Sequence, residues 1–251
     1  MTTETKKTLD SFPDYFSIKA AVTAAERDDT YRIRYRVYCE EFGYEPADRF
    51  PDRMETDAFD LNATHCLITH TASGLPAGCV RICPGWIAGA EQALPYEQCC
   101  AASLDPRAMA TIGAPREQVC EASRFAVDGA FRRRSGESLT RFGEIVAMDL
   151  SDTERRTFPL LSAALMLAAT ALAEILDRPC VFAVMEPFLP RLLQRSGLLM
   201  QRMGQDVNHH GIRAVYFSHS HMFVEAMEHG DFRQLYRWIH QQLQDTSQSP
   251  D

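Results

Sequence analysis

The most constraining feature of this chain is an apolar segment at residues 160–173 that only two hydroxyl side chains interrupt. It is shorter than the roughly 20 apolar residues that a membrane-spanning helix needs, so it predicts a buried helix and no transmembrane segment. Ser151 and Glu154 stand at the spacing of a capping box, which predicts that this helix begins after Ser151 and runs to about Leu176. A helix that is apolar nearly all round must be covered on every side, so the chain needs a large core around it.

Strand-like patterns lie on both sides of this helix. Residues 117–127 alternate polar and apolar side chains before it, and the run C-V-F-A-V-M at 180–185 follows it. The remaining patterns predict strands at 65–70, 77–83, 199–207 and 212–218, and helices at 18–41, at 187–195 and from 224 or 231 to 243. Within 18–41 arginine and apolar residues also alternate at period two, a pattern typical of a strand. The order of strand, helix and strand predicts an α/β (α+β) fold with a mixed central sheet flanked by helices.

The organisation along the chain predicts one domain over residues 1–251. Neither an internal repeat nor a long polar linker divides the sequence. Residues 84–116 are rich in proline and glycine and predict an extended insertion with one short helix. A polar tail is expected from about 244 to 251.

Net charge and lysine usage exclude several classes of protein. The chain carries a net charge of −8 and has an isoelectric point near 5.5, whereas nucleic-acid binding requires a basic surface. All three lysines precede residue 20. Chemistry that needs a lysine in the body of the fold, such as a cofactor Schiff base, a P-loop or a kinase strand lysine, is therefore excluded.

The cysteines and the first residues bear on the cellular compartment. The eight cysteines lie mostly in apolar stretches and form no C-x-x-C pair, which predicts buried thiols in a reducing environment. The first residues carry no apolar signal segment. Together these features predict a cytoplasmic protein.

The run E-A-S-R-F at 121–125 is a candidate for catalytic chemistry. In a regular strand it places Glu121, Ser123 and Phe125 on one face and Arg124 on the other. A carboxylate beside a hydroxyl can accept a proton, directly or through water, from an amine that attacks a carbonyl. The same run also suits an exposed ion pair on an edge strand, and spacing alone leaves both interpretations open.

A second candidate cluster contains Asp57 and Asp60, which suit a substrate ammonium and equally suit a solvated loop. Arg34 and Arg81 lie on apolar segments and need acidic partners such as these or Glu121. Such a network serves structure as often as catalysis. The histidines and cysteines lack the spacing of metal ligands, so we expect no metal site. Neither a G-x-S-x-G nor a G-x-G-x-x-G motif is present at a suitable place.

Four segments together resemble one family. In order they read R-Y-R-V-Y-C-E-E-F-G-Y, M-E-T-D-A-F-D, G-C-V-R and E-A-S-R-F-A-V-D. They are similar to the acyl-homoserine-lactone (autoinducer) synthases and to their relatives, the N-acyl amino acid synthases and the acyltransferases associated with PEP-CTERM/exosortase systems. The form R-Y-R-V-Y-C-E-E is most similar to the last group. The resemblance covers about residues 30–200 and implies a GNAT-like acyl-CoA N-acyltransferase fold, in which a thioester arm lies between two splayed parallel strands.

The resemblance also implies roles for individual residues. It carries the family's helix arginine onto Arg34 and its two aromatics onto Tyr38 and Tyr44. The acidic pair falls on Asp57 and Asp60, and the strand arginine falls on Arg81. The strand glutamate and its following arginine fall on Glu121 and Arg124. We expect catalysis from Glu121, Ser123 and Arg124, and substrate binding from the other residues together with Phe125. The synthases usually have Phe and Trp where this chain has Tyr38 and Tyr44, a difference that concerns the amine substrate rather than acyl transfer.

The predicted activity is transfer of a fatty acyl group from an acyl carrier protein thioester, or a coenzyme A thioester, to the amine of an amino acid or similar small molecule. The acyl-phosphopantetheine thioester is a substrate, and we expect no permanently bound cofactor. Arg132, Arg133 and Arg134, with Arg191 and Arg195, suit contact with the donor's phosphate or with an acidic carrier protein, and equally suit a solvated arginine face. Residues 133–138 half match the GNAT pyrophosphate loop, which favours coenzyme A.

Two other functions remain open from the sequence. The chain could be an acyl-homoserine-lactone synthase proper, which uses S-adenosylmethionine and closes a lactone. It could also be a GNAT-like module that binds an acyl thioester without turnover. A module that only binds needs no proton acceptor, so the presence of Glu121 favours an enzyme.

Overall fold

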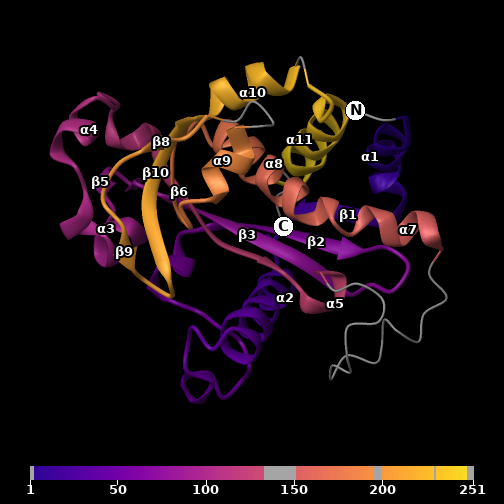
Figure 1. Cartoon of the computed structure of the whole chain (residues 1–251). Helices are drawn as coiled ribbons and strands as arrows, with labels where there is room; N and C mark the ends of the chain where they lie inside the picture. The colour runs from indigo at the N-terminus through magenta and orange to yellow at the C-terminus, as the bar shows by residue number, and fades with distance from the viewer. Residues whose placement is uncertain (1–2, 133–150, 195–198, 229, 248–251) are drawn as a thin grey trace.

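A central sheet crosses the molecule and separates two layers of helices (Figure 1). The computed structural model describes residues 3–132, 151–194, 199–228 and 230–247. Within these residues the sheet has eight strands in the order β1-β2-β3-β6-β7-β10-β8, with β9 paired to β10. The strands are β1 (Phe16–Ala20), β2 (Thr64–His70), β3 (Pro76–Pro84), β6 (Val119–Val127), β7 (Cys180–Met185), β8 (Gln201–Arg202), β9 (Val207–Asn208) and β10 (Ile212–His219). A separate small sheet pairs β4 (Trp86–Ile87) with β5 (Ala90–Glu91).

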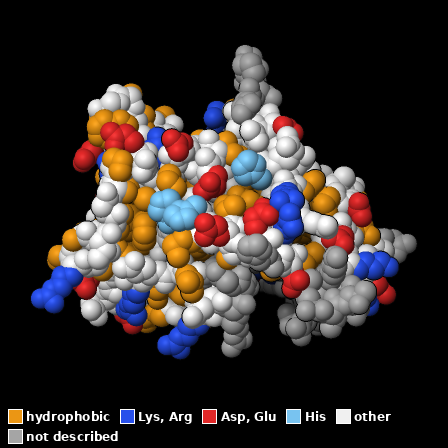
Figure 2. All heavy atoms as spheres, turned by 90° about the horizontal axis from the view of Figure 1, so that it is seen from above, with side chains coloured by type: hydrophobic (Ala, Val, Ile, Leu, Met, Phe, Trp, Pro, Cys, Tyr) orange, Lys and Arg blue, Asp and Glu red, His pale blue; other side chains and the backbone are white. Residues whose placement is uncertain are grey.

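The larger helical layer covers one face of the sheet. It contains α1 (Thr3–Tyr15), α7 (Asp152–Thr157), α8 (Leu160–Ile175), α9 (Leu189–Gln194), α10 (Ser220–Glu228) and α11 (Arg233–Ser247). α8 packs against β2, β3 and β6, and α11 packs against α8 and β1. On the surface seen from above, hydrophobic side chains are interspersed with acidic, basic and histidine side chains (Figure 2). In the described part of the chain, no helix is long and apolar enough to cross a membrane.

The opposite face carries α2 (Ala24–Arg34), which contacts β2, β3 and β6. α2 begins with a capping box between Thr23 and Glu26 and continues as a π-helical segment (Tyr35–Glu41). A π-helical turn is rare and often lies at a functional site. Val37 of this segment packs with Leu67, Cys79 and Ala126 of the sheet.

Among the described strands, β6 and β7 are the only pair that runs in parallel. Their pairing covers only Val119–Glu121 with Cys180–Phe182. Beyond it β6 remains paired with β3, and β7 remains paired with β10, so the two strands separate. The connection between them contains α7 and α8, as the order of strand, helix and strand predicted. The α/β (α+β) fold with a mixed sheet flanked by helices is confirmed.

The predicted helix at 151–176 is confirmed in its position but is divided in two. The Ser151 and Glu154 capping box starts α7, and α8 starts after Pro159. Proline lacks an N–H group and restricts the residue before it, so a continuous helix through this point is unfavourable. α8 is buried along most of its length, as its composition predicted.

The prediction of a helix from residue 18 was wrong at its start. Residues 16–20 form β1, which pairs antiparallel with β2, and Ile18 faces Ile68. The period-two alternation at 31–42 did not produce a strand, because this segment belongs to α2 and its π-helical extension. α1 was not predicted, since its sequence is polar and its burial depends on Leu9 and Phe12 meeting the core.

The insertion at 84–116 has more structure than its composition suggested. It contains α3 (Pro95–Cys99), α4 (Pro106–Ala110), the small β4–β5 sheet and the 3₁₀ turns Ala101–Ser103 and, at its end, Arg116–Gln118. Tyr96 anchors α3, because its ring stacks on Phe182 of β7 at 4.5 Å between centroids. The insertion therefore packs against the sheet beside the β6–β7 separation.

The C-terminal segments also differ in detail from the prediction. The predicted strand at 199–207 is the two short strands β8 and β9, and the last helix is the pair α10 and α11. α11 extends to Ser247, so residues 244–247 of the predicted tail are helical. Within this extension the Thr246 hydroxyl accepts a hydrogen bond from the Ala20 N–H at 3.0 Å, which attaches the end of the helix to β1.

Candidate active site

A cavity of about 430 Å³ opens where β6 and β7 separate. Part of its wall is apolar and comes from the larger helical layer, for example Met166, Leu193 and Phe223. The rest is more polar and comes from β6, β10 and the segment that follows the π-helix. The cavity therefore joins an apolar space to a polar one across the sheet.

Glu121 lines this cavity from β6, at the last residue that pairs with β7. Its side chain is almost fully buried, with 2% of its surface exposed, and its Oε2 accepts a hydrogen bond from the Tyr96 N–H at 2.7 Å. Burial raises the pKa of the carboxyl to about 8, although the Tyr96 N–H and the positive charges of Arg81 and Arg124 act in the opposite direction. No local pattern indicated the Tyr96 contact, because α3 comes from the insertion.

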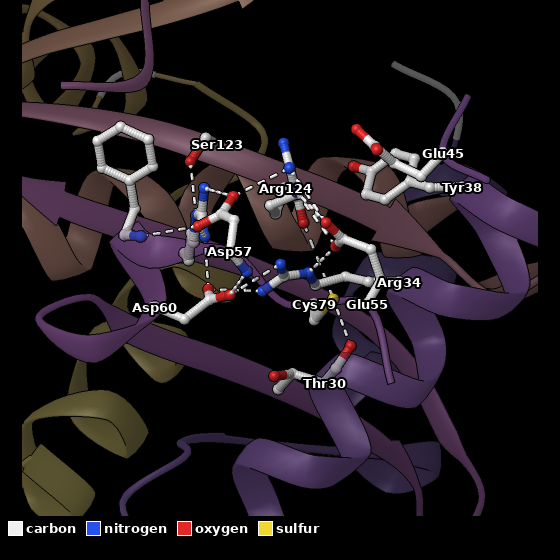
Figure 3. A network of polar contacts seen from close by, with 12 residues as sticks. Thr30, Arg34, Tyr38, Glu45, Glu55, Asp57, Asp60, Cys79, Ser123 and Arg124 are labelled. Atoms are coloured by element: carbon white, nitrogen blue, oxygen red, sulfur yellow. Dashed lines mark hydrogen bonds and ion pairs between the residues drawn. The ribbon is translucent and has the colours of Figure 1, made fainter. Parts of the chain in front are cut away.

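Arg34, the last residue of α2, lies at the centre of a buried ion-pair network (Figure 3). Its Nε donates to Glu55 at 2.5 Å, and its two terminal nitrogens donate to both oxygens of Asp60 at 2.7 and 3.0 Å. Burial alone would raise the pKa of the Asp60 carboxyl. The hydrogen bonds and positive charge of Arg34 outweigh this effect and hold the pKa well below its usual range. Glu55 was not among the predicted site residues, since nothing local indicates its partners.

Arg81 connects this network to the E-A-S-R-F strand. It is fully buried, donates to both oxygens of Asp57 at 2.6 and 2.7 Å, and also contacts Asp60. Its Nε donates to the hydroxyl of Ser123 at 3.0 Å. Ser123 is thus held by Arg81 and has no hydrogen bond to Glu121 among the described contacts.

The expectation that Arg124 faces away from Glu121 and Ser123 was wrong. Arg124 donates to Glu55 at 3.1 Å and contacts Asp57 at 2.9 Å, so it joins the network that holds Ser123. The register between β3 and β6 shifts at this point, and Arg124 has a φ of 52°. The extra residue of this β-bulge turns the side chain back to the same side of the sheet.

The predicted aromatic residues line the cavity beside the network. The Tyr38 hydroxyl donates to the backbone carbonyl of Phe125 at 2.8 Å, and Arg124 lies over the Tyr38 ring at 5.7 Å. The Tyr44 ring lies 6.2 Å from that of Tyr38 and 5.1 Å from that of His210, measured between centroids. The Phe125 side chain also lines the cavity and is 38% exposed.

The predicted donor-binding arginines are only partly described. Arg132 donates to the Val127 carbonyl at 2.7 Å and pairs with Glu41 of the π-helical segment. Arg133, Arg134 and Arg195, and with them the loop at 133–138, lie outside the described residues. Arg191 is exposed on α9.

Most of the cysteine thiols are buried within the fold. Seven of the eight cysteines, all of which are described, are buried, and Cys99 is exposed and lines the cavity. Burial raises the pKa of their thiols, as at Cys79 and Cys120, which makes them poor nucleophiles. Within the described residues, no group of three His, Cys, Asp or Glu side chains is placed to hold a metal ion.

Residues 33–141 match a family model described as an acetyltransferase (GNAT) domain. A search of curated proteins found no match.

Several solved structures share the fold at low sequence identity. The coenzyme A-dependent acyl-homoserine lactone synthase BjaI, in complex with S-adenosylmethionine and isopentyl-CoA, has 16% identity and a TM-score of 0.57, covering 85% of this chain and 88% of its own. The AHL synthase LasI has 19% identity and a TM-score of 0.54, covering 82% and 90%. FeeM, an N-acyl amino acid synthase from uncultured soil microbes, has 16% identity and a TM-score of 0.53, covering 88% and 97%. With the domain match at 33–141, these similarities show that the chain has the GNAT-like acyltransferase fold.

Proposed function

We propose that this protein is an N-acyltransferase that moves a fatty acyl group from a thioester to the amine of an amino acid or similar small molecule. The observation that carries the proposal is the buried Glu121 carboxyl at the point where β6 and β7 separate and the cavity opens. A carboxylate whose pKa is about 8 is a much stronger base than an exposed one. Its pKa is close to that of an α-amino group, about 8.

In the proposed reaction the amine nitrogen attacks the carbonyl carbon of the thioester. Glu121 takes a proton from the attacking nitrogen, directly or through water, the C–S bond breaks, and the thiolate leaves with a proton returned by Glu121. Backbone groups of β6 beyond Glu121, which have no partner on β7, are available to the acyl arm and to the negatively charged carbonyl oxygen. The apolar part of the cavity supplies a surface for the fatty chain.

The ion-pair network supports this reaction by holding the site in position. Three arginines, Arg34, Arg81 and Arg124, face three carboxylates, so the network is close to neutral within itself. Arg124 and Asp57 each keep about 24% of their side chains exposed, whereas Arg34, Arg81 and Glu55 are buried. We therefore propose that Asp57 and Arg124 contact the acceptor, and that the buried members position them.

For the donor we propose an acyl carrier protein, with coenzyme A as the alternative. Arg132 is the last residue of the short helix α5 (Gly129–Arg132), which directly follows β6. Positive side chains at 132–134 are complementary to the acidic surface of a carrier protein. The link to PEP-CTERM/exosortase systems stays an expectation from the sequence resemblance. The cytoplasmic location stays an expectation from the cysteines and the first residues.

The second candidate function is an acyl-homoserine-lactone synthase. The similarity to BjaI and LasI, over more than four fifths of this chain, favours it. Incubation with labelled S-adenosylmethionine and an acyl thioester separates the two functions, because a lactone synthase releases methylthioadenosine and an amino acid acyltransferase does not.

Untargeted lipid mass spectrometry tests the proposed function. A bacterial host that expresses this chain is compared with one that expresses Glu121→Gln, which keeps the oxygen that accepts from Tyr96 but removes the base. A new N-acyl species that the variant does not produce supports the proposal and identifies the acyl chain and the amine. The same species at equal abundance from both proteins removes Glu121 from the chemistry. The absence of any new species in both hosts, together with acyl-thioester binding by the purified protein, would favour the module that binds without turnover.

A further inference from the structure

Arg213 lines the polar part of the cavity from the start of β10. Glu121 pairs with Phe182 across β6 and β7, and Phe182 pairs with Phe217 across β7 and β10, so these three side chains share one face of the sheet. Arg213 precedes Phe217 by four residues in the same strand and therefore points to that face. The guanidinium and the proposed base thus open into one cavity from the same side of the sheet.

The Arg213 guanidinium has no acidic partner among the described residues. It lies over the Tyr44 ring at 5.4 Å from the centroid, and Tyr44 in turn stacks on His210. Its Nε is buried without a hydrogen-bond partner, and none of the described carboxylates forms an ion pair with it. A buried donor without an acceptor is unfavourable, and most such groups in proteins are satisfied by a ligand, water or another side chain.

The other arginine of the cavity wall is already occupied. Arg124 is paired with Glu55 and Asp57, so it carries little uncompensated charge. Glu45, a carboxylate of the same cavity wall, pairs with Arg49 at 3.1 Å and lies 3.6 Å from His210. Arg213 is therefore the uncompensated positive charge of the described cavity wall.

We propose that Arg213 binds a carboxylate of the acceptor and thereby selects acceptors that carry both an amine and a carboxylate. The guanidinium would donate two parallel hydrogen bonds to the two carboxylate oxygens, while Tyr44 holds its plane. This assignment rests on the proposed function, because it concerns the acceptor of that reaction. A phosphate of the donor is the competing anion, and it would pair with Arg213 through the same donors.

Product analogues test the assignment without turnover. Isothermal titration calorimetry compares a panel of N-dodecanoyl amino acids with the corresponding N-dodecanoyl amino acid carboxamides, which differ only in the negative charge. The proteins are the wild type, Arg213→Met, Arg213→Lys and the control Arg107→Met, which removes an exposed arginine on α4 away from the cavity. Circular dichroism establishes that each variant is folded.

In the wild type and in Arg107→Met we expect at least one carboxylate to bind 10-fold or more tightly than its carboxamide. Arg213→Met should abolish this preference, with a 10- to 100-fold loss of affinity for the carboxylate and less than a threefold change for the carboxamide. Arg213→Lys should restore part of the preference, because it keeps the charge but loses the paired geometry. Equal affinities for carboxylate and carboxamide in the wild type, or no binding of the whole panel, would overturn the assignment.

Kinetics then separate the acceptor from the donor. Arg213→Met should raise KM for the amino acid acceptor and leave KM for the acyl thioester unchanged, whereas the reverse result would assign Arg213 to the donor phosphate. Binding of the carboxylate analogues by a protein that forms no N-acyl product would refute the proposed function and leave the carboxylate site in place. Failure of the proposed function and failure of the Arg213 assignment are therefore distinguishable.

Discussion

The raised pKa of Glu121 predicts an unusual dependence of stability on pH. The pKa of this carboxyl is about 8 in the folded protein against a reference value of 4.5, so the folded state binds the proton more tightly than the unfolded state. The resulting stabilisation is fully present below pH 4.5 and is lost as pH rises toward 8. The whole difference corresponds to about 5 kcal/mol, because one pKa unit is worth about 1.4 kcal/mol.

Between pH 5 and pH 8 the loss from this one group comes to about 3 to 4 kcal/mol, since part of the difference falls below pH 5. Glu121→Gln has no proton to lose, and it keeps the oxygen that accepts from Tyr96. Its free energy of unfolding relative to the wild type should therefore rise by about 3 to 4 kcal/mol from pH 5 to pH 8.

Urea unfolding at the two pH values measures this change, because contributions from all other titrating groups cancel between the two proteins. Glu91→Gln, which alters an exposed carboxyl on β5, is the matched control and should differ from the wild type equally at both pH values. A difference between Glu121→Gln and the wild type that stays within about 1 kcal/mol across this range would refute the burial argument.

Two further predictions concern the arginines. Arg34→Met leaves two buried carboxylates without their main partner and should lower the free energy of unfolding by about 3 to 5 kcal/mol. Arg32→Met, which removes an exposed arginine paired with the exposed Asp28 and Asp29, should cost about 1 kcal/mol or less in the same urea titration. Equal losses in the two variants would contradict the importance of burial. Charge reversal of Arg132, Arg133 and Arg134 to Glu should raise KM for an acyl carrier protein donor roughly tenfold and leave kcat unchanged, as steady-state kinetics would measure. An unchanged KM would end the docking proposal.

Local sequence patterns predicted the framework of the fold. The apolar composition of α8, the Ser151 capping box and the strands that became β2, β3, β6 and β7 were all identifiable, because helix and strand periodicity directly reflect which side chains are buried. The pattern also placed Glu121 and Ser123 on one face, and their neighbours in β3 confirm this, since Cys83 and Arg81 pair with them in register.

Long-range packing decided what periodicity could not. The segment at 16–20 is a strand because β2 offers it an edge, and polar α1 is a helix because two of its side chains meet the core. The insertion at 84–116 folds over the sheet through the stacking of Tyr96 on Phe182. Neither partner is near in sequence, so no local pattern indicates the contact.

The candidate site shows the same division. The sequence by itself determined the chemical groups: a strand glutamate, arginines on apolar segments and an acidic cluster that had to neutralise them. Only the tertiary structure decided their connections. A one-residue bulge turned Arg124 toward Glu55, and the Tyr96 N–H reached Glu121 from the insertion. β10 brought Arg213 into the cavity without an ion-pair partner among the described residues. Charge and burial requirements are properties of single residues, whereas partners depend on strand register and on segments far apart in the chain.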